Sequence, residues 1–143
     1  DALFAKFGVA AHHAQFIEYD MVTLYLIDAA YKGQAKYREE LVNMEAIWEE
    51  KTLGQLAKYI KKSPIITKDI KDFFDEVRDK RNFLIHKFFV SNAENMLTEA
   101  GIDLAEAELD NIIELFIKCQ SLIRDTAIQL GKEAKLFEVK RLI

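Results

Sequence analysis

Hydrophobic residues recur every three to four positions along most of the chain, which is the spacing of one face of an α-helix. The first such segment is expected to run from about Ala2 to Tyr31. From Met21 onward it is apolar on most sides, which is typical of a helix at the centre of a bundle or against a second subunit. Gly33 follows as a natural helix stop.

Further along, two shorter helices are expected over residues 35–49 and 52–62. Pro64 ends the second of them, because proline lacks an amide donor and disfavours helix in the residue before it. Thr67 is the expected N-cap of a fourth helix, which should run to about Val90.

The C-terminal third of the chain carries two helix-start signals. Ser91 with Glu94 has the spacing of a capping box and predicts a short helix that closes near Gly101. Asp103 with Glu106 repeats this spacing and should open a long last helix. Apolar residues then recur at the spacing of a bundle seam: Leu109, Ile112, Phe116, Cys119, Ile123 and Leu130.

These elements predict an all-α fold, an antiparallel bundle of four to five main helices in a single domain covering residues 1–143. One Pro and five Gly in 143 residues are too few for the turns of a β-sandwich or barrel. The first and last helices carry more apolar surface than one bundle needs. A homodimer and a larger internal core are both consistent with this excess.

Cysteine usage and hydropathy narrow the class of protein. A single cysteine, Cys119, excludes an internal disulfide and a zinc knuckle, and it is expected to behave as a small buried hydrophobe. The longest apolar run is interrupted by Thr23 and Asp28, so no membrane span is expected. We therefore expect a cytoplasmic protein without a membrane partner.

The net charge of −4 conceals an uneven distribution of charge. Between Lys51 and Lys87 there are ten basic and five acidic side chains, a net charge of +5, so that the remainder carries −9. A basic region can attract polyanions even on an acidic protein, although solvated helix faces produce the same pattern. Within this region Arg78, Lys80 and Lys87 are the expected contacts to RNA.

Common metal and cofactor signatures do not occur in the sequence. There is no glycine-rich phosphate loop, no HExxH and no Glu-x-x-His. His12 and His13 are adjacent, so on a helix they point about 100° apart and are poorly placed to chelate one ion. One of them is expected to be exposed and the other packed. We therefore expect no metal and no cofactor.

The segment from Arg81 to His86 is the candidate for chemistry. Asn82 and His86 are four residues apart and share a helix face, and the long side chain of Arg81 can extend toward the same ligand. Histidine exchanges protons near neutral pH, and the guanidinium binds phosphate oxygens. The structural alternative pairs Arg81 with Asp75 or Glu76 and places His86 in a packed polar pocket.

The sequence Arg81-Asn82-x-x-x-His86 resembles the RxxxxH motif of the HEPN superfamily, small α-helical domains of toxin–antitoxin, abortive-infection and RNA-processing systems. The resemblance implies a metal-independent endoribonuclease in which the RNA 2′-hydroxyl attacks the adjacent phosphate. It implies His86 as general acid or base and Arg81 as the group that stabilises charge on the phosphoryl group. Asn82 would orient His86 or the phosphate.

The same resemblance implies a site shared between two subunits, and RNA and an antitoxin or other protein as partners. Many members have Tyr two residues after the histidine, whereas this chain has Phe88, so no role for a hydroxyl is expected there. The chain is also similar to uncharacterised bacterial proteins with an LGxL…RNxLxH…FF pattern. The alternative function is a non-catalytic dimeric module that binds nucleotides, RNA or protein.

Overall fold

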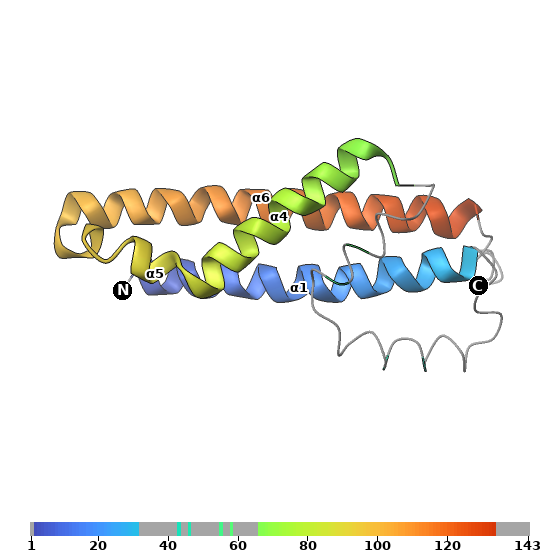
Figure 1. Cartoon of the computed structure of the whole chain (residues 1–143), viewed down its shortest axis with the longest axis horizontal. Coiled ribbons are helices and arrows are strands. Elements are labelled where there is room, and N and C mark those ends of the chain that lie inside the picture. Colours follow the sequence, from blue (N-terminus) through green and yellow to red (C-terminus); the bar gives the residue numbers. More distant parts are fainter. Residues whose placement is uncertain are drawn as a thin grey trace.

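The computed structural model describes residues 2–31 and 66–133, with the isolated positions 43, 46, 55 and 58. All regular structure in these residues is helical (Figure 1), which confirms the predicted all-α fold. The expected helices over residues 35–49 and 52–62, with the stops at Gly33 and Pro64, lie outside the described ranges. The described elements are α1 (Ala2–Tyr31), α4 (Lys68–His86), α5 (Phe88–Ser91), the 3-10 turn η1 (Asn95–Leu97) and α6 (Glu99–Glu133).

The two long helices, α1 and α6, lie side by side and run in the same direction (Figure 1). Their cross-helix contacts advance together: Lys6 bonds to Asp110, and His13 bonds to Gln120. Helix α4 crosses this pair at an angle and runs the opposite way. The antiparallel packing predicted from the sequence therefore applies to α4 against the long helices, whereas α1 and α6 are parallel to each other.

Apolar faces of α1, α4 and α6 meet in one core. The predicted seam of α6 is confirmed, since each of its members with a described side chain is at most 2% exposed: Leu109, Ile112, Phe116, Cys119 and Ile123. On α1, Met21, Val22, Leu24 and Tyr25 are all buried. These four positions form one broad buried face of about 160°, whereas Thr23 on the other side of the helix is exposed.

The start of α4 is as predicted, but the start of α6 is not. The Thr67 hydroxyl accepts a hydrogen bond from the backbone N–H of Ile70 at 3.4 Å, as an N-cap does. Helix α6 begins at Glu99 rather than Asp103, and the Thr98 hydroxyl accepts from the Gly101 N–H at 3.0 Å. The predicted cap at Asp103 is wrong because Thr98 caps the helix five residues earlier.

The segment before α6 also differs from its prediction. The capping-box spacing of Ser91 and Glu94 does not start an α-helix; the chain forms turns and the 3-10 element η1. Gly101 does not close a helix but lies within α6, where a Cβ would be 2.1 Å from the carbonyl oxygen of Asn95. Glycine is therefore required there because the α6 backbone approaches η1 closely.

The end of α4 is anchored by aromatic side chains. The predicted single helix to Val90 is interrupted at Lys87, whose N–H still bonds to the Phe83 carbonyl at 2.8 Å, and α5 follows directly. Phe88 is 1% exposed and contacts Phe7 of α1 at a centroid distance of 5.9 Å. Neighbouring ring contacts involve Phe4, Phe83 and Phe89. This cluster fixes the last turns of α4 against the first turns of α1.

Candidate functional site

Two of the three predicted site residues share one shallow surface cavity. Asn82 and His86 are exposed on the same face of α4, and both line a hollow of about 330 Å³. Asp79, Phe83 and Lys87 complete the described lining. The i, i+4 spacing that suggested a common face is therefore confirmed. His86 is open to solvent and does not lie in the packed polar pocket of the structural alternative.

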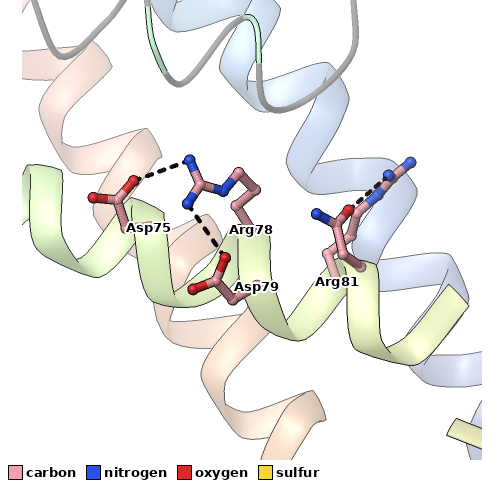
Figure 2. A network of polar contacts seen from close by, with 5 residues as sticks. Asp75, Arg78, Asp79 and Arg81 are labelled. Atoms are coloured by element: carbon pink, nitrogen blue, oxygen red, sulfur yellow. Dashed lines mark hydrogen bonds and ion pairs between the residues drawn. The ribbon is translucent and has the colours of Figure 1, made fainter. Parts of the chain in front are cut away.

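Arg81, the third predicted site residue, is turned toward α1 and is not among the described residues that line this hollow. Its Nη2 donates a charge-assisted hydrogen bond to the Glu18 carboxylate of α1. Its Nη1 reaches Asn82 Oδ1 at a long 3.5 Å, the contact drawn at the right of Figure 2. Asn82 thus stands between the guanidinium and the hollow.

The alternative interpretation of the sequence, an ion pair at Arg81, is partly confirmed: Arg81 does form an ion pair, but with a different acid from the one predicted. The expected acids were Asp75 and Glu76 on the same helix, whereas the recorded partner is Glu18, 63 residues away in the sequence. Arg78, one turn earlier, is the residue that pairs with Asp75, at 3.3 Å. No sequence periodicity connects Glu18 with the motif, so only the packing of α1 against α4 reveals it.

The three predicted RNA contacts have different surroundings in the structure. Arg78 bridges Asp75 and Asp79, the latter at 3.2 Å (Figure 2), so its charge is locally compensated. Lys80 lies over the Phe83 ring, 5.9 Å from its centroid. It also lines a second hollow, between α4 and α6, whose acidic members are Glu76, Glu108 and Glu114. Of the three, Lys87 is the one that lies beside His86.

A second polar cluster, which the sequence did not predict, lies between α1 and α6. His13 Nδ1 donates to Gln120 Oε1 at 2.7 Å, whereas His12 is exposed, as predicted for one packed and one exposed histidine. Burial raises the pKa of the Asp20 carboxyl, and nearby Arg124 acts in the opposite direction. The pKa of the Cys119 thiol rises to about 12, mainly because the thiol is buried and also because Asp20 is close.

Two negative findings hold for the described part of the chain. Within residues 2–31 and 66–133, no three His, Cys, Asp or Glu side chains gather closely enough to hold a metal ion. None of the helices described there has the length and the apolar character that crossing a membrane requires.

No family model, no curated protein and no solved structure matches the chain. The resemblance to the HEPN superfamily therefore rests on the residues of the motif and on the all-helical fold.

The side chains of the hollow can exchange protons with a ligand and donate hydrogen bonds to it. An exposed imidazole can exchange protons with a ligand in the hollow, and the Asn82 amide can donate to it. Lys87 adds a positive charge beside both groups. The guanidinium that would complete a phosphate site lies one residue away, in contact with Asn82 but paired with Glu18.

Proposed function

We propose that this protein is a HEPN-like RNA-binding protein and a metal-independent endoribonuclease. The observation that carries the proposal is the common hollow of Asn82 and His86, with Lys87 beside them and Arg81 in contact with Asn82. These are the residue types that bind a phosphodiester and move the proton of a neighbouring hydroxyl.

In the proposed reaction, neutral His86 removes the proton of the RNA 2′-hydroxyl. The oxygen then forms a bond to the adjacent phosphorus, and the bond from phosphorus to the 5′-oxygen breaks. The departing 5′-oxygen takes up the proton that His86 has accepted, and the products are a 2′,3′-cyclic phosphate and a 5′-hydroxyl. Arg81 and Lys87 stabilise the added negative charge on the phosphoryl oxygens.

Cleavage of a fluorescent oligoribonucleotide in EDTA tests this reaction. Wild type is expected to cleave, and His86→Ala should lower the rate by about 10²- to 10⁴-fold because the proton-transfer group is lost. Arg81→Ala should also be impaired. Lys118→Ala should cleave normally, because Lys118 lines the other hollow, between α4 and α6. Absence of cleavage by wild type, or equal cleavage by all variants, contradicts the catalytic proposal.

RNA binding is tested separately from cleavage, with an oligomer carrying 2′-deoxy substitutions. Lys87→Ala should weaken binding and reduce the slope of log affinity against log salt by about 0.7, the value for one phosphate contact with a single strand. Lys118→Ala is the control, since this exposed lysine lies on α6 and is not among the described residues that line the Asn82 and His86 hollow. Equal effects of the two substitutions would assign the affinity to overall charge rather than to the Asn82 and His86 face.

The second candidate function, a non-catalytic dimeric interaction module, is favoured by an exposed stripe on α1. Val9, His12, Phe16 and Tyr19 follow a three-four spacing, and the three residues other than His12 are each more than 40% exposed. Such a stripe on a soluble helix is typical of a helix–helix interface. We therefore propose that the protein forms a homodimer in which this stripe of α1 contacts the second copy.

Light scattering tests the dimer. Wild type should have twice the monomer mass, and Tyr19→Glu should be monomeric because it places a charge in the stripe. Gln15→Glu, an exposed substitution beside the stripe, should leave the mass unchanged. A monomeric wild type would remove this interface from the proposal.

A further inference from the structure

The ion pair between Glu18 and Arg81 joins α1 to α4 at the edge of the motif. Arg81 is the permanent cation of the motif, and its partner is an acid that the motif itself does not contain. The side chains of Arg81 and Glu18 are 26% and 35% exposed, so solvent reaches both. A pair in this environment is screened and of modest strength, so another anion can compete with it.

We propose that Glu18 is a positioning residue that competes with phosphate for Arg81. Its carboxylate holds the guanidinium against α1, and a phosphate in the Asn82 and His86 hollow gains Arg81 only by displacing Glu18. This inference rests on the proposed function, because it takes the hollow as the place where phosphate binds.

The donors of Arg81 are incompletely used in the observed arrangement. A guanidinium has five N–H donors in a fixed fork. Here Nη2 donates to Glu18, and Nη1 makes the long contact to Asn82. Within the described residues, the buried Nε has no acceptor at all. A phosphate offers several strong acceptor oxygens, so replacing Glu18 with phosphate satisfies more of these donors.

The required movement is short. Asn82 lines the hollow and also accepts the hydrogen bond from Arg81 Nη1, so a single side chain separates the guanidinium from the hollow. Rotation of one long side chain brings it over the ligand, and α4 itself can remain in place. The aromatic cluster around Phe88 supports this, because it anchors the end of α4 to α1.

The direct test is titration with inorganic phosphate, followed by NMR at the Arg81 side-chain Nε–H signal, which is assigned by its loss in Arg81→Lys. Glu18→Gln should bind phosphate at this position about three- to tenfold more tightly than wild type, because the competing carboxylate is gone. Glu114→Gln, the same substitution at an exposed site on α6, should match wild type. Glu18→Asp keeps the charge on a shorter side chain and should lie between Glu18→Gln and wild type.

Each result decides the inference independently of RNA cleavage. Equal or weaker phosphate binding by folded Glu18→Gln overturns it, as does an Arg81 signal that phosphate never shifts in any variant. If Glu18→Gln fails to fold by circular dichroism, Glu18→Asp takes its place, and wild-type affinity in that variant overturns the inference. Tighter phosphate binding without any RNA cleavage would sustain the role of Glu18 while contradicting the proposed ribonuclease.

Discussion

The imidazole Nδ1 of His13 and the side-chain oxygen of Gln120 are 2.7 Å apart across the parallel pair of helices α1 and α6. Gln120 is only 7% exposed, so its amide is buried next to the apolar seam of α6. Buried amides destabilise a core unless they are hydrogen-bonded. This contact therefore fixes one relative position of the two long helices, because sliding by one residue would break it.

A double-mutant cycle measures this contact. His13→Ala leaves the Gln120 oxygen without its donor and should lower the free energy of unfolding by about 1–3 kcal/mol. Gln120→Ala should have a similar cost, and the double variant should lose less than the sum by about 1 kcal/mol, because the second substitution no longer breaks a bond. Urea unfolding of the four proteins gives the coupling energy. Strictly additive losses would show that the hydrogen bond contributes nothing measurable.

The helical architecture was predictable because local patterns determine it. The bounds of α1, the cap at Thr67 and the buried positions from Leu109 to Ile123 all follow from spacing and capping preferences within a few residues. The start of α6 was misplaced because Thr98, five residues before Asp103, is also a residue type that caps helices. In the structure the Thr98 hydroxyl accepts the Gly101 N–H, so the helix begins there.

The native thiol of Cys119 should be almost inert. With a pKa of about 12, roughly one thiol in ten thousand is ionised at pH 8, and the side chain is 1% exposed. Alkylation by iodoacetamide in native buffer should therefore be slower than in denaturant by about three orders of magnitude or more, because folding raises the pKa of the thiol from the ordinary 9.0 to about 12 and buries the side chain. The matched control is the double substitution Cys119→Ser and Ser121→Cys, which moves the thiol to an exposed position of α6. Fast native labelling of wild type would contradict the buried placement.

Gly101 and Gly8 should respond to alanine in opposite directions. Alanine normally stabilises a helix relative to glycine by about 0.5–1 kcal/mol, and Gly8 has open space around the added methyl group. At Gly101 the new Cβ would meet the Asn95 carbonyl, so Gly101→Ala should lower the free energy of unfolding by about 1–3 kcal/mol. Thermal unfolding of both variants checks the pair. A stabilised Gly101→Ala would contradict the close approach of α6 to η1.

The candidate site was predictable only where it is local. Asn82 and His86 share a face because they are one helical turn apart, and the sequence was sufficient for that. The orientation of Arg81 depends on Glu18 in a different helix, which no spacing rule reaches. The net charge of the basic region did not predict which cations are available to a ligand. Arg78 is paired with Asp75 and Asp79 once the helix forms.

Asp20 should make stability depend on pH. Its pKa is raised above the ordinary 3.8 because burial penalises the carboxylate, with Arg124 opposing the shift. The folded protein therefore binds this proton more tightly than the unfolded chain, so the contribution of Asp20 to stability is present at low pH and declines as the pH rises through the folded pKa. Asp20→Asn mimics the protonated form and should stabilise the protein at neutral pH but have little effect below the unfolded pKa.

Arg124→Gln sharpens this test because it removes the cation that opposes the shift. The stability of this variant should fall more steeply than that of wild type as the pH rises from 3 to 7, over the range in which Asp20 loses its proton. Adding Asp20→Asn to Arg124→Gln should remove the extra slope, since the titrating group is then absent. Urea unfolding at several pH values measures all four proteins. An Asp20→Asn variant that is less stable than wild type at neutral pH, or a slope that survives in the double variant, would contradict the assignment to Asp20.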